Sequence, residues 1–139
     1  MRKIILAAVL LSPIFGDALV HAETPVPARQ LGRDALNGKW DLVVTPEEGN
    51  AKEFKDVLTF KGMVLTSQAR AKLGMESGPY EENTRIGGVG GFDCTIKSKT
   101  NQGTDKWSGF VGAGEMQGNL EYTKPDGTVI HYSFKGTRQ

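Results

Sequence analysis

The chain has little of what catalytic, metal-binding or disulfide-rich proteins rely on. It contains one cysteine, Cys94, and two histidines, of which only His131 lies beyond the first 22 residues. A lone cysteine has no partner for an internal disulfide, and one histidine with one cysteine is a poor donor set for a metal ion. We therefore expect no disulfide, no metal site and no cofactor.

An excess of charge of one sign is also missing. The full chain has 17 basic and 16 acidic side chains, and loss of residues 1–22 would remove Arg2, Lys3 and Asp17, which leaves 15 of each. A neutral protein offers no basic field to a phosphate backbone. We expect no nucleic-acid partner that binds by bulk electrostatics.

Long apolar runs are absent except near the N-terminus. Arg2 and Lys3 precede the apolar run 4–11, and residues 20–22 provide small side chains at cleavage positions. The run is shorter than the ~20 residues that a transmembrane helix needs. We predict a cleaved signal peptide over residues 1–22, with a retained membrane anchor as the alternative. The mature protein is then exported, to the periplasm or outside the cell, without inserting into a membrane.

Residues 23–37 precede the folded domain. Pro25 and Pro27 forbid regular backbone hydrogen bonding, and residues 28–36 allow at most a short helix, so this segment is interpreted as a linker or short helix. The ~117 residues of the mature chain suffice for one domain with a single core. We expect that domain to span residues 38–139.

From Gly38 onward, apolar and polar side chains alternate with period two, which is typical of strands that bury one face. The clearest example is the pair of strands on either side of the Lys-Pro-Asp-Gly turn at 124–127. Counting the strands between glycine-rich turns gives about eight. Short connections favour an all-β fold, a single antiparallel up-and-down barrel in which closure leaves no exposed sheet edge.

Three stretches are less regular. Residues 68–79 are too broken by glycine and proline for a helix and predict a loop or a bend, with a further strand from Tyr80 to Ile86. The glycines of 87–91 lack the lysine and the following helix of a phosphate-binding loop, so they predict a turn. For residues 106–112, the alternation leaves open which face points inward.

The start of the first strand, Gly38-Lys39-Trp40, resembles the Gly-x-Trp motif of lipocalins and the wider calycin superfamily. The resemblance implies that an arginine near the end of the last strand, here Arg138, packs over Trp40 and closes one end of the barrel. A guanidinium over an indole face contributes about 0.5–2 kcal/mol. The middle-strand motifs of lipocalins have no clear counterpart in this chain. The resemblance also implies a small, mostly apolar ligand inside the barrel.

Inward side chains are the candidates for contacts with such a ligand. By the parity of the alternation they are Tyr122, Tyr132, Trp107, Phe92, Met116 and Asp56, with Trp107 depending on which face of its strand points inward. Each of them is more often ordinary core, because aromatic and aliphatic residues dominate protein interiors. Asp56 is unusual because it lies on an apolar face, where a buried carboxylate needs a partner. It either orients a polar group of the ligand or escapes burial at a bulge or a strand end.

Two functions therefore remain open. The first is an exported barrel that binds a small, mostly apolar molecule in a cavity of at least ~300 Å³. The second is a filled-core structural or protein-interaction module with no ligand and with an apolar surface patch. We do not expect an enzyme, because His131 and Ser133 share the polar outer face of the last strand. Cys94 shares the inward parity of Phe92 and is expected to be buried and unreactive.

Overall fold

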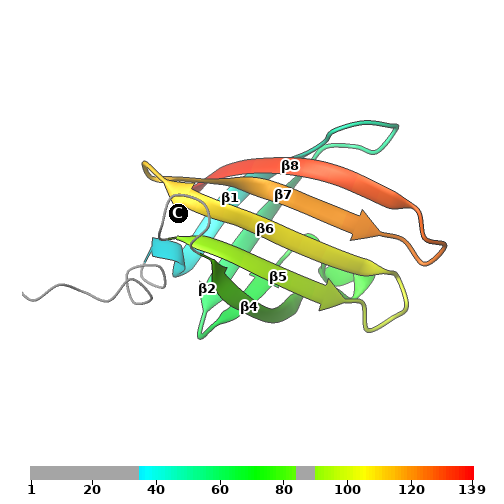
Figure 1. Cartoon of the computed structure of the whole chain (residues 1–139), viewed down its shortest axis with the longest axis horizontal. Coiled ribbons are helices and arrows are strands. Elements are labelled where there is room, and N and C mark those ends of the chain that lie inside the picture. The colour runs from blue at the N-terminus through cyan, green and yellow to red at the C-terminus, as the bar shows by residue number, and fades with distance from the viewer. Residues whose placement is uncertain (1–34, 84–89) are drawn as a thin grey trace, which may run out of the picture.

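The computed structural model describes residues 35–83 and 90–139, which form a closed barrel. The expected signal peptide, residues 23–34 of the expected linker, residues 84–86 of the strand expected from Tyr80 to Ile86 and residues 87–89 of the glycine cluster lie outside this part of the chain. Eight antiparallel strands of the described residues follow one another in chain order, and the last pairs with the first (Figure 1). They are β1 (Gly38–Pro46), β2 (Phe54–Lys61), β3 (Val64–Ser67), β4 (Ser77–Asn83), β5 (Gly91–Lys97), β6 (Thr104–Gly112), β7 (Glu115–Thr123) and β8 (Val129–Arg138). The predicted up-and-down barrel is confirmed.

Alternation along the strands places one set of side chains inside the barrel. On β6, Trp107 is buried while Phe110 lies on the outside, which settles the face that the sequence left open. The interior residues of the strands are at most 5% exposed: Trp40, Leu42, Val44, Leu58, Phe60, Leu65, Tyr80, Phe92, Cys94, Ile96, Trp107, Met116, Leu120, Tyr132 and Phe134. Large side chains thus occupy the interior along its length.

Glycines on the inner face make room for these aromatic rings. A Cβ atom on Gly118 would lie 2.8 Å from Cζ of Phe134, and one on Gly109 would lie 2.9 Å from the same atom. The Phe134 ring meets the edge of Trp107, with ring centroids 5.5 Å apart. Large rings that lie opposite glycines fill the interior of a small barrel at the density of a protein interior.

One end of the barrel is closed around Trp40. The Arg138 guanidinium carbon lies 4.5 Å from the centre of the Trp40 ring, as the family resemblance implies. The indole N–H of Trp40 donates a hydrogen bond of 2.8 Å to the carbonyl of Leu36. Arg138 also donates to the carbonyls of Ala35 and Asn37, so the residues before β1 are held against this end. We call it the Trp40 end.

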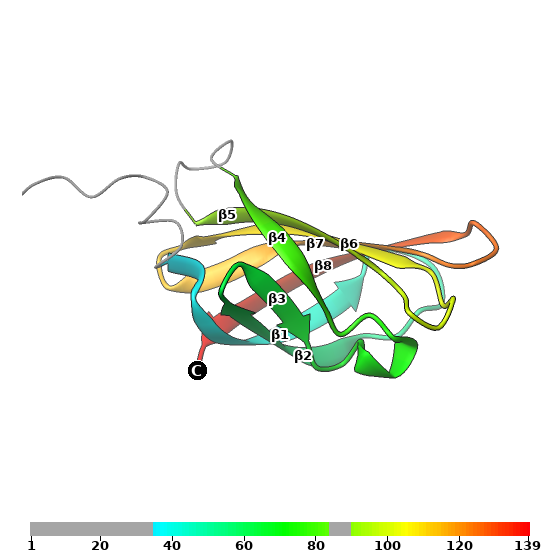
Figure 2. The ribbon, with the colours of Figure 1, turned by 90° about the horizontal axis from the view of Figure 1, so that it is seen from below.

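The opposite end is covered by the chain between β3 and β4. This stretch contains a short 3₁₀ turn, η2 (Ala71–Leu73), and Figure 2 shows it at the end of the barrel away from the C-terminus. The loop expected over residues 68–79 is confirmed up to Glu76, but β4 begins at Ser77, before the expected start at Tyr80. We call residues 67–76 the plug segment, and this end the Arg70 end.

The close packing of Gly118 predicts the effect of a single methyl group. Gly118→Ala would drive a Cβ into the Phe134 ring and into the carbonyl of Ser108 on the paired strand. We expect a loss of about 1–3 kcal/mol in the free energy of unfolding, measured by urea denaturation. Gly112→Ala is the control, because the nearest atom to its new Cβ is 4.0 Å away. A Gly118→Ala protein as stable as that control would contradict the filled interior.

Candidate functional site

A buried ion pair lies at the Arg70 end of the barrel. Arg70 immediately precedes η2 and is 6% exposed, while Asp105 on β6 is completely buried. Nε and Nη2 of Arg70 donate to Oδ2 and Oδ1 of Asp105 at 2.8 and 2.9 Å. Such a two-pronged contact fixes both the position and the orientation of the guanidinium plane.

Aromatic rings from two strands lie beside this guanidinium. Its central carbon lies 4.6 Å from the ring centre of Tyr122 on β7 and 5.6 Å from that of Phe54 on β2. The Phe54 ring in turn meets Tyr132 of β8 edge to face, with centroids 5.6 Å apart. The Tyr122 hydroxyl donates to the carbonyl of Gln102 at 2.9 Å, which fixes that ring. Arg70 therefore sits in a box with a carboxylate at its edge and aromatic rings beside it.

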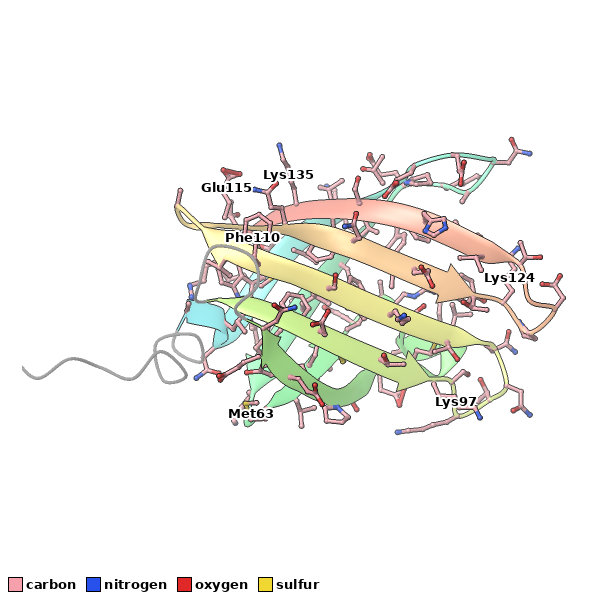
Figure 3. All side chains as sticks on the ribbon, viewed as in Figure 1. Met63, Lys97, Phe110, Glu115, Lys124 and Lys135 are labelled. Atoms are coloured by element: carbon pink, nitrogen blue, oxygen red, sulfur yellow. The ribbon has the colours of Figure 1, made fainter. Side chains whose placement is uncertain are left out.

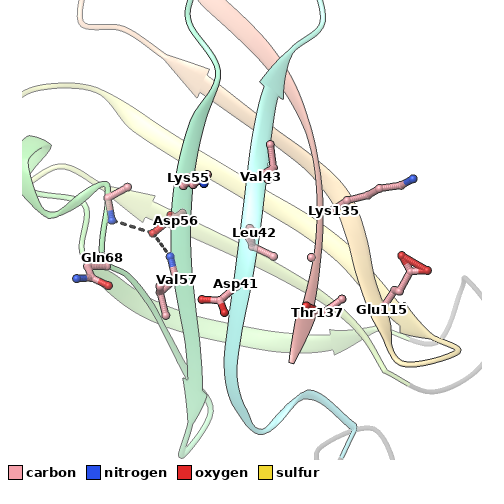
Figure 4. A pocket seen from close by; sticks show the side chains of 12 residues that line it. Asp41, Leu42, Val43, Lys55, Asp56, Val57, Gln68, Glu115, Lys135 and Thr137 are labelled. Carbon is pink, nitrogen blue, oxygen red and sulfur yellow. Dashed lines mark hydrogen bonds between the residues drawn. The ribbon is translucent and has the colours of Figure 1, made fainter. Parts of the chain in front are cut away.

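Asp56 on β2 holds the start of the plug segment. Its carboxylate accepts hydrogen bonds from the Ser67 hydroxyl at 2.5 Å and from the backbone N–H groups of Val57 and Ala69 at 2.7 and 2.8 Å. Figure 4 shows the two backbone bonds. The pairing of β1 with β2 is unbroken here, with Leu42 opposite Asp56. The alternative of a bulge or strand end is therefore wrong, and Asp56 is a buried carboxylate with several donors.

The charges of this cluster are not balanced. Two carboxylates, Asp56 and Asp105, share the single basic side chain, Arg70, that is buried in the described part of the chain. Burial raises the pKa of Asp105, against the lowering effect of its hydrogen bonds to Arg70. Burial likewise raises the pKa of Asp56, against the bonds from Ser67 and the backbone. Raised carboxyl pKa values in one cluster are a common property of binding and catalytic sites.

The far end of the plug segment is tied to the turn between β5 and β6. The carbonyl of Leu73 accepts from the Ser98 hydroxyl at 2.5 Å, and the carbonyl of Gly74 accepts from the Lys99 N–H at 3.1 Å. Gly74 has φ of 74°, and a Cβ there would lie 2.9 Å from Oγ1 of Thr100. Together with Asp56 at its start, these contacts anchor the plug segment on both sides of Arg70.

The structure divides the six expected ligand-contact residues into two groups. The first lies at the Arg70 end: Tyr122 packs against Arg70, Tyr132 packs against Phe54, and Asp56 accepts hydrogen bonds from Ser67 and Ala69. The second lies within the packed interior and consists of Phe92, Trp107 and Met116, each at most 1% exposed. The indole N–H of Trp107 has no hydrogen-bond partner within the described ranges.

Sequence reasoning missed Arg70, Asp105 and Ser67. Asp105 shares the inward parity of Trp107 on β6, so the alternation could have found it once the face of that strand was known. Ser67 shares the inward parity of Leu65 at the end of β3. Arg70 lies in the irregular stretch, where no periodicity reports a direction.

A second feature lies on the outside of the barrel. A groove of about 950 Å³ runs over β8, β1 and β2 (Figure 4). At its centre Val43 is 39% exposed and is paired with Lys55 on one side and Lys135 on the other. Figure 3 shows Lys135 and Glu115 projecting from the outer surface. Of the six expected ligand-contact residues, Asp56 lines this groove, and Trp107 lines a separate hollow of about 480 Å³.

Other chemistry-bearing residues are dispersed. Cys94 is buried, and burial raises the pKa of its thiol to about 12, so it is a poor nucleophile. His131 and Ser133 are exposed on the outer face of β8, as expected. Residues 35–83 and 90–139 contain no group of three or more His, Cys, Asp or Glu side chains that could hold a metal ion. The same ranges contain no helix of the length and apolarity that crossing a membrane requires.

No family model matches the chain, and no curated protein matches it. Among solved structures, a redesigned β-barrel is similar, with a TM-score of 0.46 and 14% sequence identity. The match covers 78% of this chain and 96% of that one.

The buried ion pair predicts a specific pattern of stability. Asp105→Asn leaves the Arg70 guanidinium buried without its counter-charge, and we expect a loss of about 3–5 kcal/mol in urea denaturation. The double variant Arg70→Met with Asp105→Leu removes both charges and should recover most of that loss, since apolar replacements need no pairing.

The exposed pair of Lys99 and Glu76, 3.0 Å apart, provides the control. Glu76→Gln should leave the denaturation midpoint nearly unchanged, because surface ion pairs are well solvated. A double variant at Arg70 and Asp105 that is no more stable than Asp105→Asn alone would contradict the pairing described here.

Proposed function

We propose that this protein is an exported, non-catalytic binding protein that takes a small, mostly apolar molecule at the Arg70 end of its barrel. The observation that carries the proposal is the arrangement of Phe54, Tyr122 and Tyr132 around the ion pair of Arg70 and Asp105. Ligand sites in proteins are mostly apolar and aromatic, with a few fixed polar groups that orient the ligand. The Arg70 end has this composition.

Stability alone does not account for charges at this position. A buried ion pair contributes little compared with apolar side chains of the same volume, because both charges lose their hydration. Leucine or methionine at these two positions would need no charge partner. A binding role gives Arg70 and Asp105 a reason to be there.

The lipocalin-like assignment belongs to the same proposal. Arg138 over Trp40 matches the closure that the resemblance implies, and it makes the Trp40 end a poor entrance. Among the described residues the plug segment lies across the Arg70 end, and this end is the entrance we propose. Export rests on the basic and apolar pattern of residues 1–22.

Native mass spectrometry of the protein purified from the exported fraction of its own cells tests the proposal. We expect a stoichiometric small molecule that leaves on gentle activation and whose rebinding shifts the NMR signals of Tyr122 and Tyr132. A bare mass, together with no response of these signals to apolar probes, would reject binding at the Arg70 end.

A second candidate function is a filled-core module that binds a protein partner through its outer surface. The observation that favours it is the groove over β8, β1 and β2, where Val43 is 39% exposed while the interior is filled. Apolar side chains exposed in a groove are common in protein interfaces.

A matched pair of substitutions tests this second candidate. Val43→Glu places a charge in the groove, whereas Val129→Glu places one on an equally exposed valine, 40%, outside it. A partner that binds the wild-type chain and the Val129→Glu variant, but not the Val43→Glu variant, would support an interface at the groove. Equal binding by both variants would reject it.

A further inference from the structure

The environment of the Arg70 side chain has the chemistry of a site for organic cations. Asp105 accepts two hydrogen bonds from the edge of the guanidinium. The rings of Tyr122 and Phe54 lie 4.6 and 5.6 Å from the central carbon of the guanidinium. Proteins bind guanidinium and ammonium groups in this way, by combining a carboxylate with the electron-rich faces of aromatic rings. Arg70 occupies a position that a ligand of the same chemistry would fill.

The box and its occupant come from different parts of the fold. The side chains that form the box belong to barrel strands: Phe54 on β2, Asp105 on β6, Tyr122 on β7 and Tyr132 on β8. Arg70 belongs to the plug segment, which lies across the barrel end between β3 and β4. The wall of the barrel therefore forms the box without Arg70, and only its contents depend on the plug segment.

The charge of the box favours a cation over an anion or a neutral group. Asp105 is completely buried and accepts two hydrogen bonds from Arg70, which is the one buried basic side chain among the described residues. Without Arg70, the box retains the completely buried carboxylate of Asp105 with no cation beside it. A cationic group is the occupant that restores the balance.

We propose that this box is a binding site for a guanidinium or ammonium group carried on an apolar stem, and that Arg70 fills it in the free protein in exchange with that ligand. The inference rests on the proposed function, because it names the ligand chemistry of the same site. The apolar stem would lie against Phe54 and Tyr132, which already meet edge to face. Arg70 of the plug segment then competes with the cationic ligand for the same box.

Chemical rescue of an emptied box tests the chemistry of the site. Arg70→Ala removes the occupant, and N-ethylguanidinium reproduces the part of the side chain beyond Cβ. We expect the variant to gain about 5 °C in melting temperature at roughly tenfold the dissociation constant of this ion. Urea and sodium chloride at the same concentrations should produce no such gain, because neither combines the planar donors with the charge.

Two matched variants control the rescue. Arg70→Ala combined with Asp105→Asn lacks the carboxylate and should not respond to N-ethylguanidinium. Lys72→Ala removes an exposed cation of the same segment and should not respond either. Equal stabilisation of Arg70→Ala by urea, or of the double variant by N-ethylguanidinium, would overturn the proposal.

A second experiment uses the wild-type chain, and it tests the cation site even if the Arg70→Ala variant does not fold. Titration with N-benzylguanidinium should shift the NMR signal of the Arg70 Nε–H and increase its exchange with solvent as the side chain leaves Asp105. If N-benzylguanidinium does not bind, or if it saturates another site while the Arg70 Nε–H signal stays unchanged, the proposed exchange is overturned.

The outcome separates this inference from the proposed function. A neutral co-purifying molecule found by native mass spectrometry would keep the proposed function and overturn the cation site. A bare mass and no response of the Tyr122 and Tyr132 signals to apolar probes, combined with selective rescue and with displacement of Arg70 in the wild-type chain, would reject the mostly apolar ligand of the proposed function and support the cation site.

Discussion

The pairing of β8 with β1 is the constraint on which the rest of this molecule depends. It joins strands about 90 residues apart in sequence and converts a meander into a closed barrel, with Trp40 opposite Arg138 at one end and Pro46 opposite Tyr132 at the other. Closure removes both sheet edges, so every strand is hydrogen-bonded on both sides. It also sets the interior volume, and every inward side chain must then fit within that volume.

Two consequences of this fixed interior are visible. The first is the alternation of size: the Phe134 ring takes the space that side chains at Gly109 and Gly118 would need. The second concerns charge. A charged group inside a closed barrel is largely removed from water, so it must find partners within the chain. Arg70 finds Asp105, and Asp56 finds the donors at the start of the plug segment. The same bonds that satisfy these charges hold the plug segment across the Arg70 end.

Much of this fold could be predicted from the sequence, because each strand is recognisable from the alternation of apolar and polar residues within a few positions of one another. Period-two alternation identified the strands, and it placed Asp56 on an inward face, where the structure has it. The family resemblance paired Trp40 with Arg138, which are in contact. The candidate site was recovered only in part. Tyr122 and Tyr132 lie in it, but Arg70 does not belong to a strand, and its direction is set by a carboxylate 35 residues away in sequence. No local pattern reports such a pairing.

The sequence by itself determined which side of each strand is apolar, where the chain turns, and hence the all-β barrel. The tertiary structure decided how the interior is used. Alternation reports the face of a side chain and carries no information about the volume left between faces, so only the closed barrel could reveal that Phe92, Trp107 and Met116 are packed core. The partners of the buried charges were also a tertiary matter. An ion pair forms between groups brought together by the whole fold, whereas a strand pattern depends on neighbours two residues apart.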